Sequence, residues 1–347
     1  MSISSGPVLS VRDLTVEIPT RHGVLRPVDG VSWEIAAGEI LGVVGESGAG
    51  KSMTGNAVIG LLDRPARIAS GEVWLSGARI DDLPPDEMRH MRGRHIGMVF
   101  QDPLTSLNPL LTVGEQLEET ILTHLPVTGR EARERALAAL VEVGIPAAAA
   151  RIDAYPHEFS GGMRQRVVIA LALCAEPSLV IADEPTTALD VSVQAQITAL
   201  LKRLARERGT AVMLVTHDMG VIAETVDRVA VMYAGRLAEI GPVREVMTEP
   251  AHPYTAGLMA ATPLASVEAG AERLNQIPGA MPRLDAIPDG CAFHPRCPRA
   301  EDRCRHDPRP TIEACGGHSS DRSGAACWFA DEVRERHIVA GEREVAA

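Results

Sequence analysis

The sequence predicts an α/β fold built on a parallel sheet with helices on both faces. Three short apolar runs rich in β-branched residues, at 39–45, 178–183 and 211–217, have the composition of strands that are buried on both sides. Helical patterns lie between these runs, at 163–174 and 191–207. Because strands and helices alternate along the chain, we expect a doubly wound sheet, with a ligand site at the carboxyl ends of its strands.

Segments outside this core have different patterns. Residues 8–18 and 28–35 alternate between apolar and polar, which predicts half-exposed antiparallel strands. The pattern over about 88–165 is mainly helical, and we interpret this stretch as a helical subdomain. Beyond about residue 245, Pro, Cys and Arg become frequent and apolar runs become rare. We therefore predict a core domain over 1–245 and a C-terminal extension over 246–347.

Composition limits the classes of protein to which the chain can belong. The hydrophobic fraction of 45% and the charged fraction of 23% are those of an ordinary globular protein, and the net charge of −12 argues against a general nucleic-acid binder. The first twenty residues lack a secretory signal, and no apolar run approaches the ~18 residues of a membrane span. We therefore expect a cytosolic protein, in which grouped cysteines favour a metal or cluster over disulfides.

One glycine-rich turn has the pattern GxxxxGK[ST] and lies between a buried strand and a helical pattern, as a phosphate-binding loop requires. Its backbone N–H groups can point inward and cradle phosphates, helped by the helix N-terminus. Lys51 is a compact charge that can reach β- and γ-phosphates, whereas the wider guanidinium of Arg fits this place poorly. Ser52 offers a hydroxyl to Mg²⁺. The predicted phosphate-binding residues are Gly45, Glu46, Ser47, Gly48, Ala49, Gly50, Lys51 and Ser52.

Polar side chains end the other two buried strands. Asp183 and Glu184 follow one run, at the sheet edge where α/β folds bind ligands. We predict that Asp183 holds Mg²⁺ through water and that Glu184 polarises the attacking water. His217 ends the third run at the same edge, within reach of a γ-phosphate. Solvated acids and a structural histidine are the alternatives, and a phosphate loop on the same sheet favours the functional interpretation.

The segment Ser160-Gly161-Gly162 directly precedes a helical pattern. Ser160 can cap that helix while the glycine amides stay exposed, which makes a second anion site. A capped helix without a ligand is the simpler alternative. A second phosphate site has a use only if it serves the nucleotide of another subunit.

The motifs over about residues 8–245 resemble, in their order along the chain, the motif set of ABC ATPases. They are the phosphate loop, Gln101, the Ser160 turn, the Asp-Glu strand end, Asp190 and His217. The resemblance implies a P-loop ATPase core that binds ATP and Mg²⁺ and carries an antiparallel β subdomain and a helical subdomain. It also implies that Gln101 senses Mg²⁺ and the membrane subunits, and that Asp190 signals across a dimer.

The dimer that this resemblance implies is formed head to tail with a second ABC ATPase subunit. In it, the signature residues Ser160, Gly161 and Gly162 of one subunit close over the ATP that the other subunit holds. The resemblance assigns catalysis to Glu184, His217 and Gln101. It assigns Mg²⁺ binding to Ser52, Asp183 and Gln101.

Several stretches resemble one family of these ATPases, the bacterial dipeptide/oligopeptide importers. They are QDPLTSLNP (101–109), FSGGMRQRV (159–167), HPYT (252–255) and GCAFHPRCP (290–298), and RGRHIGMVFQDP (92–103) is similar to the first of that family's two paired ATPases. The resemblance implies a peripheral protein at the cytoplasmic face of the inner membrane. Its partners are then two transmembrane permease subunits and an extracytoplasmic solute-binding protein, with no nucleic acid, and its ATP hydrolysis powers peptide uptake.

The chain departs from the family where adenine is held. Family members often stack an aromatic ring on the base near position 18, whereas this chain has Ile18, and Trp33 is its only aromatic residue before the phosphate loop. Apolar packing is the expected replacement.

The C-terminal cysteines lie in a Pro/Arg-rich segment with little apolar material to fold around, and such segments usually need a staple. The spacing of Cys291, Cys297 and Cys304 is longer than the CxxC pairs of structural zinc sites, so zinc is possible but less favoured. The family resemblance implies a [4Fe–4S] cluster. We select Cys327 as the fourth ligand because Ala-Cys-Trp there resembles the family's closing motif, with Cys315 as the alternative. Free thiols are the competing interpretation.

Other functions stay open beside peptide import. Related importers carry nickel or other small solutes, and the sequence does not name the cargo. A soluble ABC ATPase acting on nucleic acid or the ribosome is the alternative of a different class, which the acidic composition and the single cassette disfavour. A non-catalytic cassette is disfavoured because Lys51, Glu184 and His217 are all present.

Overall fold

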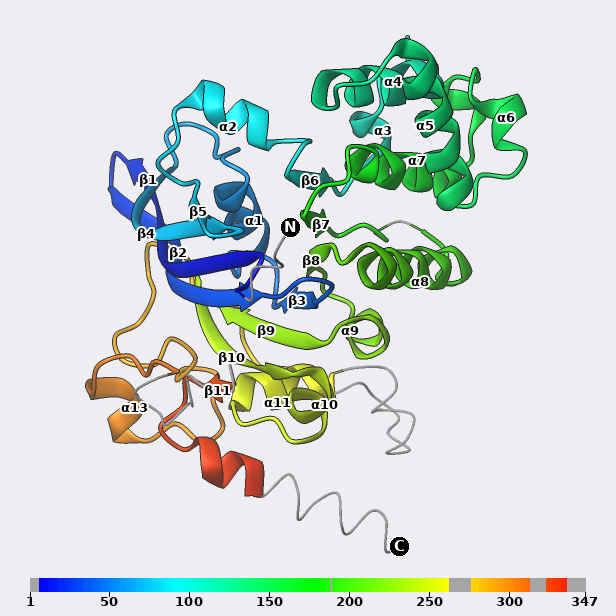
Figure 1. Cartoon of the computed structure of the whole chain (residues 1–347). Helices are drawn as coiled ribbons and strands as arrows, with labels where there is room; N and C mark the ends of the chain where they lie inside the picture. The colour runs from blue at the N-terminus through cyan, green and yellow to red at the C-terminus, as the bar shows by residue number, and fades with distance from the viewer. Residues whose placement is uncertain (1–5, 188, 262–275, 313–322, 336–347) are drawn as a thin grey trace, which may run out of the picture. The chain divides into compact units, whose positions relative to one another are not determined.

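The computed structural model describes residues 6–187, 189–261, 276–312 and 323–335 (Figure 1). The chain divides into two compact units. Unit 1 consists of Met1–Ser10, Glu34–Ile40 and Trp74–Val215, and unit 2 consists of Val11–Trp33, Leu41–Val73 and Thr216–Ala347. No helix among the described residues is long and apolar enough to cross a membrane.

Three parallel strands form the sheet of unit 1, in the order β8 (Ala211–Val215), β7 (Leu179–Asp183) and β6 (Ile96–Val99). The β7 and β8 strands were predicted from their continuous apolar runs, and nearly all of their side chains are buried. The β6 strand lies inside the stretch that was expected to be mainly helical. Its four residues are too few to stand out from sequence periodicity.

Helices pack around this sheet. They include α7 (Gly161–Leu173) and α8 (Val191–Arg208), as predicted from the helical patterns. The approach of α7 to β6 is close, because a Cβ atom on Gly97 would lie 2.2 Å from the carbonyl oxygen of Ala172. The short helix α2 (Pro85–Met91) precedes β6.

The helical subdomain belongs to unit 1 and is built from α3 (Pro103–Ser106), α4 (Val113–His124), α5 (Gly129–Glu142), α6 (Ala148–Arg151), the 3₁₀ turn η1 (Pro156–Glu158) and α7. Two of these helices begin with a capping box, in which a threonine and a glutamate three residues later satisfy each other's backbone N–H groups. Thr112 pairs with Glu115 at α4, and Thr128 pairs with Glu131 at α5. Buried leucine and isoleucine side chains of α4 and α5 form the core between them.

In unit 2, β3 (Ile40–Val44) pairs in parallel with β9 (Arg228–Tyr233), and β10 (Arg236–Pro242) pairs antiparallel with β9. The two-residue strand β11 (Gly324–Ala325) joins the free side of β10, so the C-terminal region adds a strand to this sheet. The helices α1 (Lys51–Val58) and α9 (Met219–Thr225) follow the chain's phosphate loop and His217 respectively.

A second, four-stranded sheet has the order β2-β1-β4-β5. Its strands are β1 (Leu9–Thr20), β2 (Gly23–Ile35), β4 (Arg67–Leu75) and β5 (Ala78–Arg79), and β4 and β5 are antiparallel. Buried and more exposed residues alternate over 14–17 of β1 and 31–35 of β2, as the alternating sequence predicted for half-exposed strands, whereas residues 9–11 of β1 are all buried.

The described part of the C-terminal region contains α10 (Val243–Thr248), α11 (Pro253–Ala260) and α13 (Asp302–His306). Few of its residues belong to regular elements, which is consistent with its composition. It is held instead by single buried side chains, among which Tyr254, Phe293 and Arg296 recur below.

Candidate nucleotide and cysteine sites

The predicted phosphate loop connects β3 to α1 in unit 2, as its sequence pattern requires. Gly45 has φ +149°, and a Cβ atom there would lie 2.3 Å from the carbonyl oxygen of Met232. Gly50 has φ +105°, and its Cβ atom would lie 2.3 Å from the carbonyl oxygen of Pro27. Both positions therefore need glycine, for their backbone angle and for the closeness of neighbouring backbone.

Lys51 occupies the first position of α1 and is buried. Its ammonium donates hydrogen bonds to the carbonyl oxygens of Gly45, at 2.8 Å, and of Glu46, at 3.1 Å. The cation is thus held over the loop whose N–H groups are expected to cradle phosphates.

The outer side of the phosphate loop contacts the C-terminal region. The backbone N–H of Glu46 donates to the hydroxyl of Tyr254 at 2.9 Å. The carboxylate of Glu46 accepts from the guanidinium of Arg296 at 3.0 Å. The two partners lie in the stretches HPYT and GCAFHPRCP, whose resemblance to the family predicted no role for either residue.

Gln101 and Glu184 come together in unit 1, although 83 residues separate them. The amide of Gln101 donates to Oε2 of Glu184 at 2.9 Å, and the hydroxyl of Thr187 donates to the same oxygen, also at 2.9 Å. Glu184 has φ +47°, in the left-handed region that non-glycine residues rarely adopt. Its backbone N–H donates to the carbonyl of Val215 at the end of β8. Asp183, the last residue of β7, is half-buried.

The signature turn begins α7 in unit 1, and Ser160 is its N-cap, with its hydroxyl accepting from the N–H of Met163 at 3.4 Å. The predicted helix cap is therefore present. Asp190 caps α8 in the same way, accepting from the N–H of Val193 at 2.9 Å. The two helix starts are packed together, because a Cβ atom on Gly162 would lie 2.6 Å from a methyl of Val193.

His217 lies in unit 2, in the turn between β8 and α9, with its side chain exposed. The following residue, Asp218, caps α9 by accepting from the N–H groups of Gly220 at 2.8 Å and Val221 at 3.2 Å. The histidine is thus presented by a short turn that is tied down on its C-terminal side.

Four cysteines line one small cavity in unit 2, namely Cys291, Cys297, Cys304 and Cys327. All four are free thiols. Burial raises the pKa of Cys291 to about 11 and that of Cys327 to about 12. The alternative ligand, Cys315, lies outside the described residues. Cys174 is buried at the end of α7, as expected for a core cysteine.

The surroundings of the cysteine cavity offer polar groups to a ligand that the thiols would hold. The backbone N–H of Arg299 donates to the sulfur of Cys297 at 3.4 Å. The indole N–H of Trp328, which also lines the cavity, is buried and has no hydrogen-bond partner among the described residues. Within those residues, no three His, Cys, Asp or Glu side chains are disposed to hold a single metal ion.

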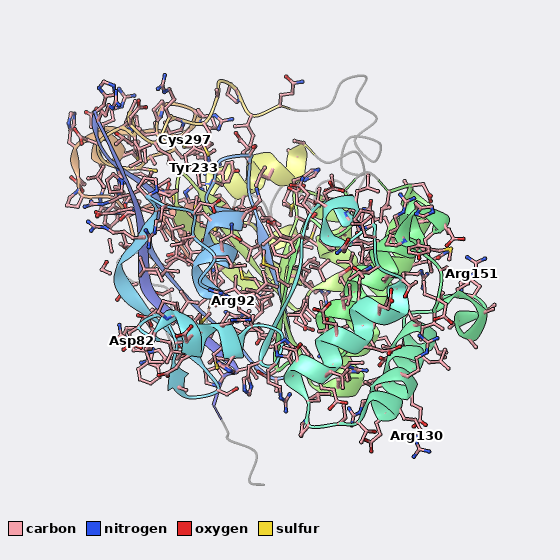
Figure 2. All side chains as sticks on the ribbon, turned by 90° about the horizontal axis from the view of Figure 1, so that it is seen from above. Asp82, Arg92, Arg130, Arg151, Tyr233 and Cys297 are labelled. Carbon is pink, nitrogen blue, oxygen red and sulfur yellow. The ribbon has the colours of Figure 1, made fainter. Side chains whose placement is uncertain are left out.

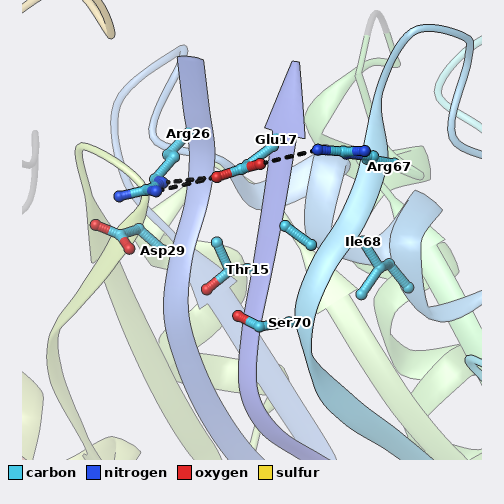
Figure 3. Close-up of a pocket in the computed structure, with 8 residues that line it drawn as sticks. Thr15, Glu17, Arg26, Asp29, Arg67, Ile68 and Ser70 are labelled. Atoms are coloured by element: carbon cyan, nitrogen blue, oxygen red, sulfur yellow. Dashed lines mark hydrogen bonds and ion pairs between the residues drawn. The ribbon is translucent and has the colours of Figure 1, made fainter. Parts of the chain in front are cut away.

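A polar surface pocket of unit 2 was not predicted from the sequence (Figure 3). Glu17 lies at its centre, accepting from Arg26 at 3.0 Å and pairing with Arg67 at 3.5 Å. Asp29, at its side, pairs with Arg236 at 2.7 Å. Since Glu17 pairs with both arginines of the pocket and Asp29 adds a second negative charge to its lining, the pocket does not have the unbalanced positive charge of an anion site.

Comparison with known proteins identifies the family. Residues 28–187 match the family model described as ABC transporter, and residues 238–304 match that of the oligopeptide/dipeptide transporter C-terminal region. The chain is 46% identical to the dipeptide transport ATP-binding protein DppD of Bacillus subtilis, over 96% of this chain and 98% of that protein. This chain belongs to the ATP-binding subunits of dipeptide/oligopeptide ABC transporters. It is 50% identical to the oligopeptide transport ATP-binding protein OppD of Salmonella typhimurium, over 87% of this chain and 89% of that protein.

A solved structure supports the same fold. This ABC subunit matches the dimeric, post-hydrolysis structure of the ATP-binding cassette MJ0796 bound to ADP and Pi, with a TM-score of 0.61 and 32% sequence identity, over 68% of this chain and 99% of that one. The predicted fold class, an ABC ATPase with an antiparallel β subdomain and a helical subdomain, is confirmed. The chain is an ABC ATPase, and binding of ATP with Mg²⁺ is typical of that class.

Proposed function

We propose that this ATPase powers the uptake of di- or oligopeptides from the cytoplasmic face of the membrane, through two permease subunits that an extracytoplasmic binding protein supplies. One observation carries the proposal: the similarity to named peptide-transport subunits extends beyond the ATPase core into the C-terminal region. That region has its own family match, to the oligopeptide/dipeptide transporters. The match favours peptide over nickel or another small solute as cargo.

The proposed chemistry assigns one task to each polar group of the ATP site. Lys51 neutralises β- and γ-phosphate charge, and the glycine amides of the loop donate to the phosphate oxygens. Ser52, Gln101 and Asp183 supply the oxygen ligands that Mg²⁺ prefers, directly or through water, and the ion would neutralise further phosphate charge when bound. The carboxylate of Glu184 accepts a proton from the attacking water, and His217 contacts the γ-phosphate.

Dimerisation is proposed to complete the site. The capped start of α7 presents Ser160, Gly161 and Gly162 with their amides available, a form suited to phosphate. A subunit binds one ATP at its own phosphate loop and has no second nucleotide to place at this turn. We therefore assign the turn to the ATP of a partner ATPase. Asp190 at the adjoining helix start is placed at the same interface, where the next residue, Val191, is 84% exposed.

The permease contact is proposed for the surface that follows Gln101. Large apolar side chains are exposed there at Leu104 (63%) and Leu110 (82%), next to Phe100 (44%). Exposed large apolar side chains that lie this close together in the sequence favour a protein-protein contact. Because Gln101 bonds directly to Glu184, a shift of this surface would reach the water-activating carboxylate through one side chain.

The cysteine cavity is proposed to hold a [4Fe–4S] cluster ligated by Cys291, Cys297, Cys304 and Cys327. The donor set fits, since four thiols line one cavity, the N–H of Arg299 already donates to the sulfur of Cys297, and the indole N–H of Trp328, in the same lining, has no partner among the described residues. A structural zinc ion, with sulfur ligands about 2.3 Å from the metal, is the alternative occupant of the same four thiols. The cluster would act as a staple for the C-terminal region. Because that region would then be stabilised by its own cluster, we also propose the division of the chain into 1–245 and 246–347.

Assembly gives the most direct test of the proposed partnership. The isolated chain should hydrolyse ATP slowly, and activity should rise when the second ATPase and the permease subunits are added, because each ATP then meets a signature turn. Full activity of the isolated chain, independent of its concentration, would contradict the composite site.

A further inference from the structure

The phosphate loop is held from outside by two side chains of the C-terminal region. Tyr254 is fully buried, and its hydroxyl accepts the N–H of Glu46 at 2.9 Å. Arg296 is 8% exposed, and its guanidinium donates to the carboxylate of Glu46 at 3.0 Å. A methyl group of Met281 also lies near Gly48, 3.2 Å from where a Cβ atom would be. Three residues beyond the ATPase core thus contact the loop that binds phosphate.

The contact with Glu46 is one hydrogen bond away from the ammonium of Lys51. The carbonyl oxygen of Glu46 is one of the acceptors that hold the ammonium of Lys51. A rotation of Glu46 would therefore move a hydrogen-bond partner of the lysine as well as the loop backbone. Positioning of this kind affects phosphate binding without any contact to the nucleotide.

Both outer contacts are themselves fixed. The N–H of Tyr254 donates to Nδ1 of His252 at 3.0 Å, and the carboxylate of Glu239 on β10 accepts from the N–H groups of Ala251 and His252 at 2.9 and 3.0 Å. Arg296 donates through Nε to the carbonyl of Pro278 at 2.8 Å. These buried hydrogen bonds leave neither side chain free to follow the loop passively.

Packed aromatic rings connect these contacts to the cysteine cavity. The ring of Phe293 lies 5.4 Å from that of Tyr254 and 5.2 Å from that of Tyr233, centroid to centroid. The guanidinium of Arg296 lies 5.9 Å from the same phenylalanine ring. Phe293 also lines the cavity with the four cysteines. In Figure 2, the labelled residues Tyr233 and Cys297 lie in the same part of the molecule. One cluster of side chains therefore touches the cavity on one side and the phosphate loop on the other.

We propose that Tyr254 and Arg296 are positioning residues for ATP binding, which brace the phosphate loop through Glu46, and that Phe293 carries the state of the cysteine cavity to this brace. The first part depends only on the membership of the chain in the ABC ATPase family. The second part rests on the proposed cluster, because it gives the cavity an occupant. By linkage, occupation of the cavity and occupation of the phosphate loop then favour each other.

The test measures the equilibrium affinity of the purified full-length chain for ATPγS with Mg²⁺, so that neither hydrolysis nor a partner is needed. Arg296→Gln should weaken binding about ten-fold, the effect expected when a charge-assisted hydrogen bond is lost. Arg296→Lys, which keeps the charge, should recover part of the loss. Arg283→Gln is the matched control, since that exposed arginine of the same region pairs with nearby Asp285 rather than with the phosphate loop among the described residues, and the variant should bind normally.

A double-mutant cycle assigns the effect to the brace. Glu46→Gln and Arg296→Gln should each weaken binding, and together they should weaken it little more than either alone. In the assembled transporter, the same changes should raise KM for ATP and leave kcat within two-fold, a split that general destabilisation would not produce. If Arg296→Gln fails to fold, Tyr254→Phe removes one hydroxyl from a kept ring and decides the matter. Binding within two-fold of the wild type in that variant would overturn the brace.

Phe293→Leu tests the second part. The variant should weaken ATPγS binding although its side chain touches neither nucleotide nor phosphate loop. Wild-type affinity in this variant, together with weakened binding in Arg296→Gln, would refute transmission from the cavity and keep the brace. Both binding measurements can be made without iron, and the iron content of the purified protein tests the cluster separately, so failure of the cluster proposal would remove the second part and leave the brace standing.

Discussion

Replacing Glu184 by glutamine is expected to stop hydrolysis while it leaves ATP binding intact. The hydrogen bonds from Gln101 and Thr187 both reach Oε2, each at 2.9 Å. A glutamine can place its carbonyl oxygen at that position and keep both bonds, which turns its NH₂ group to the position of Oε1. The local structure is then preserved, but the side chain can no longer accept a proton from water.

The size of the effect follows from what is lost. A positioned general base contributes about 10²–10⁴-fold to a rate, so turnover of Glu184→Gln should fall by that factor, which corresponds to ~3–5 kcal/mol in the barrier. Thr187→Val is a useful comparison, because it removes one neutral donor to the carboxylate and keeps the base. It should cost about 1 kcal/mol, or roughly five-fold in rate.

The assay is single-turnover hydrolysis of ATP by the assembled transporter, with ATP affinity measured separately by equilibrium binding. Glu184→Gln should bind ATP within two-fold of the wild type. A hydrolysis rate within ten-fold of the wild type would refute the role of this carboxylate. An equal loss in Thr187→Val and Glu184→Gln would show that orientation, rather than proton acceptance, is what the residue supplies.

Three further predictions concern the partner site, the buried carboxylate and the cysteines. Ser160→Arg should abolish hydrolysis of the ATP that the partner ATPase holds. The measurement uses a complex in which this chain also carries Lys51→Ala, so that its own ATP site is silent. Normal hydrolysis by that complex would show that the signature turn is not part of the composite site. Burial raises the pKa of Glu239 from 4.5 to about 7, so the stability that its protonated form contributes is fully present below pH 4.5 and is lost as the pH rises through about 7. The free energy of unfolding should therefore fall by ~3 kcal/mol more between pH 4.5 and pH 8 in the wild type than in Glu239→Gln, measured by urea denaturation, and parallel curves would count against this assignment. Anaerobically purified protein should absorb near ~400 nm and carry about four irons, which Cys327→Ser should lose and Cys174→Ser should keep; retention of full iron in Cys327→Ser would move the fourth ligand to Cys315, and colourless protein with stoichiometric zinc would exclude the cluster.

Local chemistry was the part of this molecule that the sequence predicted best. The phosphate loop was predicted because glycines, a lysine and a serine must follow one another in a strand-to-helix turn, and each of those constraints acts within eight residues. The cap at Ser160 is of the same kind, since the residue and the N–H that it accepts are three positions apart. Buried parallel strands such as β7 were predicted because burial on both faces leaves a continuous apolar run.

Contacts between distant residues were not predictable from spacing. The hydrogen bond between Gln101 and Glu184 joins residues 83 positions apart, and that between Glu46 and Tyr254 joins residues 208 positions apart. Neither pair carries a mark in the sequence, because a glutamine or tyrosine has many possible partners. The stretches HPYT and GCAFHPRCP were noted only for their resemblance to the family. The structure gives them a physical reason, since one supplies Tyr254 and the other supplies Arg296 to the same glutamate of the phosphate loop.

The central claim is that ATP hydrolysis by this chain drives peptide import, and transport in reconstituted vesicles tests it most directly. The complete transporter, with its second ATPase, both permease subunits and the binding protein, is supplied with ATP on the cytoplasmic side and a radiolabelled mixture of di- and tripeptides on the other. We predict ATP-dependent accumulation of peptide that is lost when this chain carries Lys51→Ala, because the phosphate loop then lacks its cation. Vesicles that hydrolyse ATP but accumulate no peptide, or that accumulate it equally with Lys51→Ala, would contradict the claim.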